Sequence, residues 1–211
     1  ELLYSDLNRT VILVIGESLR YDTFSMHDNK LTPKLQSLMQ GSKFHFKKVY
    51  SGGTMTKVSV SVLMNRLKYP EGLAQISKSD NCLFKLAKEN GFGTHFISAQ
   101  NSTHLQMLTN IICPKYIDNY IVKDDFKKYI QPVGYDEDIL STLKNRDLLN
   151  KNNFIVLQQL GSHSHYESRY PKEFDKFTPY ENTALYTDTN LYNLLQYIDA
   201  NTKQETFVFY V

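Results

Sequence analysis

The chain has 211 residues, of which 41% are hydrophobic and 22% are charged, and its formal net charge is +2. That length suits about one globular domain with a substantial core, and the composition excludes a disordered or low-complexity protein. The weak net charge and the short basic runs argue against a nucleic-acid partner. The two cysteines, Cys82 and Cys113, allow either one disulfide or two thiols.

Segments that favour strands alternate with segments that favour helices along the chain. The expected strands are residues 11–15, 44–50, 93–98, a short one near 120, 153–159 and 206–211. The expected helices are residues 32–39, 54–64, 80–90, 104–109, 135–143 and 181–200. We therefore predict an α/β domain with a mostly parallel central sheet flanked by helices.

Two of these helices carry local boundary signals in addition to the hydrophobic pattern. Thr32 followed by Pro33 is typical of an N-cap residue and the first helical position. Asp80 is an N-cap candidate for the amphipathic helix that follows it, and Gly91 is expected to end that helix. These signals support the predicted alternation independently of hydrophobicity.

The first strand delivers an acidic residue, Glu17, to its carboxyl end. Open α/β sheets place their ligand sites at the carboxyl ends of strands, so Glu17 is a candidate ligand for a divalent cation such as Zn²⁺. The alternative is a glutamate that caps a helix or forms a salt bridge, and this segment alone leaves that alternative open.

A glycine and hydroxyl cluster runs from Ser51 to Ser61 and enters an expected helix. At least one hydroxyl of this cluster is expected at the helix N-terminus, where free N–H groups bind phosphate. A metal there would also activate a threonine hydroxyl as a nucleophile. The alternative is an ordinary hydroxyl N-cap. The candidates are Thr54, Thr56, Ser59 and Ser61.

The segment Gly161–Tyr166 follows another apolar strand and contains His163 and His165. In an extended loop these side chains would project to the same side and could share a metal ion or a phosphate oxygen. Exposed surface histidines are the alternative. The acidic triplet of residues 136–138 starts an expected helix, so we interpret it as helix-capping and not as a ligand cluster.

Several separated segments together resemble the phosphoethanolamine transferases of the alkaline phosphatase and sulfatase superfamily. The resemblance keeps its order along nearly the whole chain. Its segments are Val11–Arg20, Gly53–Ser59, Gln159–Ser164, Arg169–Pro179 and Glu181–Asp188.

The resemblance implies a role for each of five residues. Glu17 would be a zinc ligand, and Thr56 would be both a zinc ligand and the nucleophile that carries phosphoethanolamine as a covalent intermediate. His163 aligns with a histidine that helps to hold the phosphoryl group or a second metal. Asn101 and His104 fall near a segment that lines the same pocket in relatives.

The resemblance also implies a reaction and a location. Members transfer phosphoethanolamine from phosphatidylethanolamine to lipid A or to a core sugar of lipopolysaccharide, at the periplasmic face of the bacterial inner membrane. Residues 1–211 would then be a partial periplasmic catalytic domain, with an N-terminal membrane anchor and a C-terminal segment outside it. That segment carries the Asp and His that complete the zinc site, so we expect the 211 residues alone to be inactive.

Other interpretations remain open at this point. Gly52 and Val62 stand where lipid A-modifying relatives have a disulfide around the nucleophile, which leaves a core sugar as an equally good acceptor. Another hydrolase or phosphotransferase of the same superfamily is a second candidate, although no cysteine lies near Thr56 to serve as a sulfatase nucleophile. A non-catalytic fragment with the fold and no complete metal site is the third.

Overall fold

The computed structural model describes residues 8–24, 30–39, 45, 47–67, 81–109, 111–126 and 134–211. Five strands form one sheet of order β3-β2-β4-β1-β5, and the four pairings among these described strands are all parallel. The strands are β1 (Arg9–Ile15), β2 (Gly93–Ser98), β3 (Asn119–Ile121), β4 (Asn153–Gln158) and β5 (Glu205–Tyr210).

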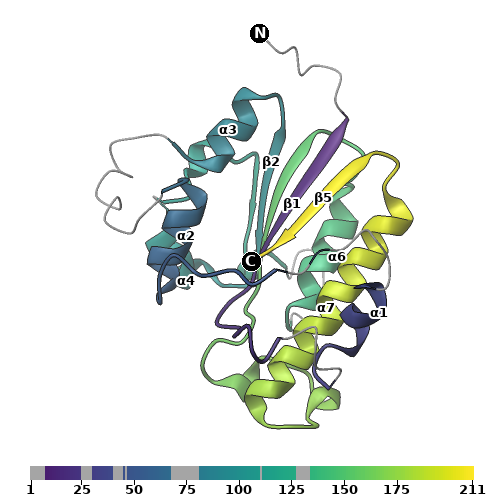
Figure 1. Ribbon diagram of the computed structural model, residues 1–211. Coiled ribbons are helices and arrows are strands. Elements are labelled where there is room, and N and C mark those ends of the chain that lie inside the picture. Colours follow the sequence, from purple (N-terminus) through teal and green to yellow (C-terminus); the bar gives the residue numbers. More distant parts are fainter. Residues whose placement is uncertain are drawn as a thin grey trace.

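Helices cover both faces of this sheet, with α1, α6 and α7 on one face and α2, α3 and α4 on the other (Figure 1). The helices are α1 (Pro33–Met39), α2 (Thr56–Met64), α3 (Leu83–Glu89), α4 (Ser102–Thr109), α5 (Lys123–Phe126), α6 (Glu137–Arg146) and α7 (Pro179–Asn201). Among the described residues, no helix is both long and apolar enough to cross a membrane.

Strand β1 contributes to both hydrophobic cores because its side chains alternate between the two faces of the sheet. Ile12 and Val14 pack into the core under α1, α6 and α7. Leu13 and Ile15 pack into the core under α2, α3 and α4. Burial on both faces is typical of a parallel sheet between helices, and each such side chain stabilises the fold by roughly 1.5–3 kcal/mol.

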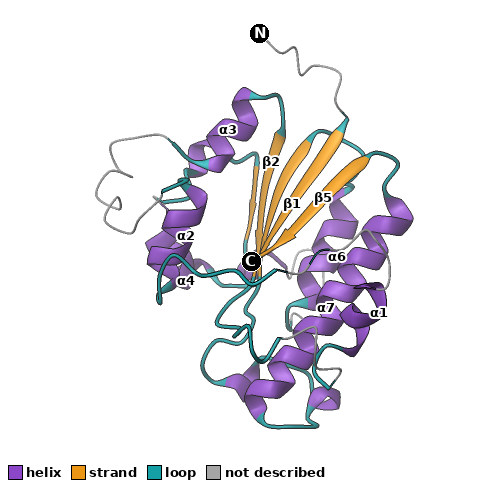
Figure 2. Cartoon of the chain, viewed as in Figure 1, coloured by secondary structure: helices purple, strands orange, loops and turns teal. Residues whose placement is uncertain are grey.

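The carboxyl ends of β1, β4 and β5 lie at one edge of the sheet, where the strands converge (Figure 2). Ile15 is opposite Gln158, and Val14 is opposite Tyr210. The pairing continues beyond β1, since Gly16 N–H donates to the Val211 carbonyl at 2.8 Å. The chain therefore leaves the sheet at Glu17, beside the segment that follows β4.

The predicted α/β alternation is confirmed, but the strand expected at residues 44–50 is wrong for its described part. Residues 45 and 47–50 form no strand, and residues 44 and 46 lie outside the described residues. The side chains of Val49 and Tyr50 are 62% and 79% exposed, so no neighbouring strand covers them. The Lys48 ammonium lies over the rings of Tyr21 and Tyr50 instead, at 5.5 and 5.3 Å from their centroids.

Most helix boundaries differ from the prediction by a few residues. The expected cap Asp80 lies outside the described residues, and Cys82 stands at the N-cap of α3. Gly91 has φ +78°, which fits its expected role after the helix end. Helix α7 begins at Pro179, two residues before the expected start, because Thr178 and Glu181 form a capping box.

Cys82 and Cys113 form a disulfide, with their Cα atoms 6.4 Å apart. The bond joins the start of α3 to the residue that precedes a short 3-10 helix (Pro114–Tyr116), on the α2, α3 and α4 side of the sheet. It therefore covalently joins two segments that are far apart in the sequence.

Replacing both cysteines by serine is expected to lower the free energy of unfolding by about 3 kcal/mol, because the cross-link restricts the unfolded chain over a separation of 31 residues. Urea unfolding of the double variant and of reduced wild-type protein should give the same lowered midpoint. An unchanged midpoint in both samples would contradict the prediction.

His95 ties the amino-terminal halves of three strands together. Its Nδ1 accepts a hydrogen bond from the Asn119 amide at 2.9 Å, so its Nε2 carries the proton and donates to Asn153 Oδ1 at 3.0 Å. Burial lowers the pKa of His95 below its usual value of 6.5. The fold therefore holds this imidazole in its neutral form.

The lowered pKa of His95 predicts a loss of stability in acid. The stabilisation is fully present above the unfolded-state pKa near 6.5 and is lost as pH falls through the folded-state pKa. In His95→Gln this loss should be absent, since an amide does not titrate. Urea unfolding from pH 7.5 to 5 should show that the free energy of unfolding of wild type decreases relative to that of His95→Gln. A constant difference over that range would refute this.

Candidate active site

Glu17 and Thr56 meet at the carboxyl edge of the sheet. The Thr56 hydroxyl donates to the Glu17 carboxylate, with Oγ1 lying 3.0 Å from Oε2 and 3.2 Å from Oε1. Both side chains are half-buried, so the pair is open to a ligand from one side. The structure thus brings together the two residues that the sequence analysis selected first.

The backbone after Glu17 is held by helix α7. Ser18 has φ +54°, a left-handed conformation that turns the chain away from the strand direction. The Tyr180 hydroxyl donates to the Ser18 carbonyl at 3.1 Å and accepts from the Arg20 N–H at 2.9 Å. A side chain from α7 therefore fixes both sides of the turn that follows Glu17.

Thr56 is the first residue of α2 and is positioned by the glycines that precede it. A Cβ at Gly52 would lie 2.8 Å from Cγ1 of Val62, and a Cβ at Gly53 would lie 2.5 Å from Cγ1 of Val58. The loop can therefore fold onto α2 only because both positions lack side chains. Gly52 and Val62 are also the positions that the resemblance matches to a disulfide, and the structure places them in contact.

The N-terminus of α2 presents backbone donors beside Thr56. Met55, the N-cap residue, is extended, and its side chain makes no capping hydrogen bond. Its carbonyl accepts the N–H groups of Val58 and Ser59, both at 2.9 Å. The N–H groups at the very start of a helix have no intrahelical acceptor, and with the helix dipole they favour an anion there.

The turn after β4 holds the backbone of Glu17 in place. Ser162 N–H donates to the Glu17 carbonyl at 2.8 Å. Gly161 has φ +56°, and a Cβ there would lie 2.7 Å from the Glu17 carbonyl oxygen. Glycine is required here for its conformation and for this close approach. The Ser162 hydroxyl accepts from the Thr183 hydroxyl of α7 at 2.7 Å.

The acidic triplet of residues 136–138 lies at the start of α6 as expected, with Asp136 at the N-cap position and Glu137 and Asp138 in the first turn. Asp136 nevertheless makes no side-chain capping hydrogen bond to α6. Its carboxylate accepts instead from the N–H groups of Leu160 and Gly161, at 2.7 and 3.0 Å. Burial raises the pKa of Asp136 to about 6, while those two hydrogen bonds and the positive charges of Lys123 and Arg169 act in the opposite direction.

The remaining candidates lie near the same edge, but within the described part of the chain they are not hydrogen-bonded to Glu17 or Thr56. His163 is exposed, and its Nδ1 lies 3.1 Å from the Ser164 hydroxyl. His165 has φ +64°, so the extended backbone that would project both histidines to one side is not formed. Asn101 Oδ1 accepts from the His104 N–H at 2.9 Å, which makes Asn101 the cap of α4.

The donor set at this edge fits a divalent cation only in part. The Glu17 carboxylate and the Thr56 hydroxyl are adjacent oxygen donors of the kind that Zn²⁺ accepts. In the part of the chain that the structure describes, no three His, Cys, Asp or Glu side chains gather closely enough to hold a metal ion. A zinc site needs at least three protein ligands, so these two residues would require further ligands.

Comparison with known proteins gives two curated relatives of low identity. The Kdo(2)-lipid A phosphoethanolamine 7''-transferase of Escherichia coli (strain K12) is 23% identical over 223 residues, which cover 95% of this chain and 38% of that protein. Phosphoethanolamine transferase EptA of Salmonella typhimurium is 28% identical over 218 residues, which cover 89% of this chain and 37% of that protein. The chain thus spans less than two fifths of either relative.

Solved structures share the fold at low sequence identity. The C-terminal periplasmic domain of EcEptC from Escherichia coli has a TM-score of 0.80 and 22% identity, and the match covers 98% of this chain and 63% of that chain. The complex of that domain with Zn has a TM-score of 0.79 and 21% identity, over 98% of this chain and 64% of that chain.

The expected fold class, of alkaline phosphatase and sulfatase type, is confirmed by these neighbours and by the parallel sheet. A model of the Sulfatase family matches residues 9–211, which is almost the whole chain. The protein therefore belongs to the sulfatase family.

Proposed function

We propose that this protein transfers phosphoethanolamine from phosphatidylethanolamine to lipid A or to a core sugar of lipopolysaccharide. The observation that carries the proposal is the Thr56 hydroxyl, which contacts the Glu17 carboxylate at 3.0 and 3.2 Å at the start of α2. Support also comes from the names of the two curated relatives, which describe phosphoethanolamine transferases.

Thr56 is the nucleophile in this proposal. Its Oγ1 attacks the donor phosphorus, a bond forms between Oγ1 and phosphorus, and the bond from phosphorus to the diacylglycerol oxygen breaks. The Thr56 hydroxyl proton, which faces the Glu17 carboxylate, is transferred to the diacylglycerol oxygen as that bond breaks, so diacylglycerol leaves as an alcohol. The acceptor hydroxyl then attacks the same phosphorus, and its proton returns to Thr56 Oγ1 as the bond between Oγ1 and phosphorus breaks.

The developing negative charge on the phosphoryl oxygens has two sources of stabilisation. The first-turn N–H groups of α2 lie next to Thr56 at the start of the helix, where they favour an anion. A Zn²⁺ ion, when bound, neutralises phosphoryl charge and favours the ionised form of a coordinated hydroxyl. Glu17 and Thr56 would hold it together with an Asp and a His that the resemblance assigns to a segment outside residues 1–211.

His163, Asn101 and His104 are proposed to contact the substrate. His163 follows Ser162, whose N–H is bonded to the Glu17 carbonyl, so it is attached to the turn beside the nucleophile. Asn101 and His104 lie at the start of α4, which follows the carboxyl end of β2 at the same edge of the sheet. Their positions suit contacts with the acceptor or with the phosphoethanolamine headgroup.

The proposed location is the periplasmic face of the bacterial inner membrane, with an N-terminal membrane anchor outside residues 1–211. The Cys82–Cys113 disulfide supports an oxidising compartment. The similar EcEptC domain is described as periplasmic, which is consistent with this location.

Thr56→Ala in the full-length protein is expected to lower transfer from labelled phosphatidylethanolamine at least about a thousandfold, because the attacking oxygen is lost. Mass spectrometry of wild type should find phosphoethanolamine on the peptide that contains Thr56. Thr56→Ser should keep part of the activity. Ser59→Ala, which removes a hydroxyl bonded only to backbone carbonyls of the same helix, is the matched control and should stay active.

Two results would redirect this assignment. Undiminished transfer by Thr56→Ala would remove Thr56 as the nucleophile. Release of free phosphoethanolamine without modification of lipid A or core sugar would instead indicate a hydrolase of the same superfamily. Separating the lipid and the water-soluble products of one reaction distinguishes these outcomes.

A further inference from the structure

We propose that Asp136 is a positioning residue for Glu17 and acts through the turn that follows β4. Its carboxylate holds that turn by two backbone N–H groups, and the backbone of Glu17 rests on the same turn. The proposal rests on the proposed function in one respect, since Glu17 has catalytic importance only if it ligates the metal ion.

The contact between Asp136 and the turn uses both carboxylate oxygens. Oδ1 accepts from Leu160 N–H at 2.7 Å, and Oδ2 accepts from Gly161 N–H at 3.0 Å. Asp136 is only 4% exposed, so water does not compete for these bonds. An asparagine offers one acceptor oxygen and a donor amide, and the amide would face an N–H group. The geometry therefore requires a carboxylate.

The turn transmits this constraint to Glu17 through direct contacts. A Cβ at Gly161 would lie 2.7 Å from the carbonyl oxygen and 2.9 Å from the nitrogen of Glu17. The next residue, Ser162, donates its N–H to the Glu17 carbonyl at 2.8 Å. A shift of Gly161 would therefore displace the Glu17 backbone, and with it the carboxylate beside Thr56.

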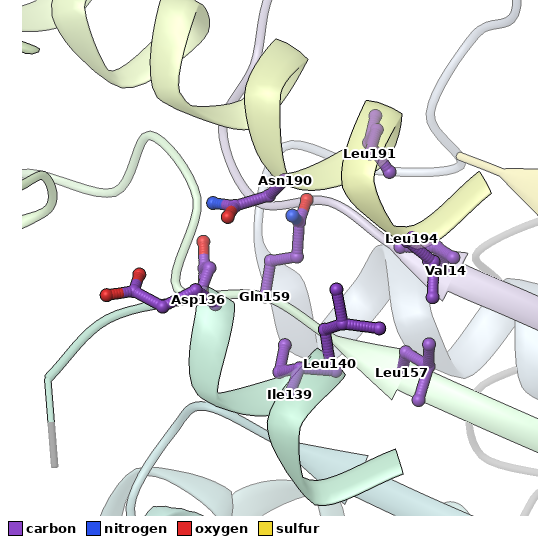
Figure 3. Close-up of a pocket in the computed structure, with 10 residues that line it drawn as sticks. Val14, Asp136, Ile139, Leu140, Leu157, Gln159, Asn190, Leu191 and Leu194 are labelled. Carbon is purple, nitrogen blue, oxygen red and sulfur yellow. The ribbon is translucent and has the colours of Figure 1, made fainter. Parts of the chain in front are cut away.

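A small cavity behind the turn has Asp136 in its wall. It has a volume of about 20 Å³ and lies between β1, β4, α6 and α7. Asp136, Gln159 and Asn190 gather at one end of it, and leucines and Val14 line the other (Figure 3). Gln159 Oε1 and Asn190 Nδ2 are buried and have no hydrogen-bond partner among the described residues.

A cavity of this size and polarity has room for about one water molecule, which would satisfy both of these atoms. Burial raises the pKa of Asp136 to about 6, which still lies below pH 7.5, so the carboxylate is mostly ionised at that pH and can accept both N–H groups.

Asp188 provides a matched control on helix α7. It is also fully buried, and its two oxygens accept from consecutive N–H groups, those of Lys34 and Leu35, at 3.1 and 2.9 Å. The contact is chemically the same, but it holds the start of α1 and does not touch the turn under Glu17. Asp188→Asn therefore reproduces the structural cost without the proposed positioning effect.

The test compares Asp136→Asn with Asp188→Asn in the full-length protein by zinc titration against a competing chelator at pH 7.5. Asp136→Asn is expected to weaken zinc affinity about tenfold or more, as for other residues that orient metal ligands. Asp188→Asn should bind zinc within about twofold of wild type, although both variants lose stability in urea. Equal zinc affinity in wild type and Asp136→Asn overturns the proposal.

Gly161→Ala provides a second variant that keeps the buried carboxylate. It should weaken zinc binding because its Cβ displaces the Glu17 backbone. If both changes act through one turn, the double variant should lose less affinity than the product of the two single losses. Independent losses would overturn the shared route. If Asp136→Asn fails to fold, unchanged zinc affinity in Gly161→Ala would overturn the role of the turn.

Glu17→Ala separates the two proposals. Loss of zinc binding in Glu17→Ala with full binding in Asp136→Asn refutes only the positioning role. Full zinc binding in Glu17→Ala refutes Glu17 as a ligand and therefore the metal site of the proposed function.

Discussion

The register of parallel strands at one edge of the sheet is the constraint on which the candidate site depends. Ile15 lies opposite Gln158, and backbone pairing of β1 with its neighbours continues as far as Gly16. Glu17 therefore leaves the sheet at a fixed point. A shift of β1 by one residue would turn its core side chains to the wrong faces, so the two hydrophobic cores also fix the position of Glu17.

The position of Thr56 beside Glu17 is fixed by fewer long-range contacts than that of Glu17 itself. It lies 39 residues after Glu17 in the sequence, and a glycine-containing loop leads into α2. Contacts of Gly52 and Gly53 with valines of α2 set the path of this loop. The strand thus places the carboxylate through the core, whereas the loop and the helix place the hydroxyl through local packing.

The sequence allowed prediction of the features that depend on general rules. Parallel strands bring their carboxyl ends to one edge, and helix N-termini face that edge, so these rules predicted that Glu17 meets a hydroxyl of the cluster from Ser51 to Ser61. The choice of Thr56 within that cluster came from the family resemblance. The strand expected at 44–50 is wrong at its described residues, 45 and 47–50, which pair with no described strand, and the composition of the segment does not reveal this. The early start of α7 could have been predicted from the capping residues Thr178 and Glu181. The contacts of Asp136 could not, because they depend on tertiary structure.

Two carboxylates near this edge have opposite surroundings, and that difference suits different tasks. Asp136 is buried and accepts hydrogen bonds from two backbone N–H groups, so its charge stabilises the turn after β4. Glu17 is half-buried and accepts only from the hydroxyls of Thr56 and Ser18 among the described residues, so its oxygens remain accessible to a cation or a substrate. A side chain that binds a metal ion or substrate changes its bonding partners during a reaction, whereas a side chain that positions a turn must keep the same hydrogen bonds. This difference supports the proposed roles, in which the more deeply buried acid positions the turn and the more accessible acid takes part in the chemistry.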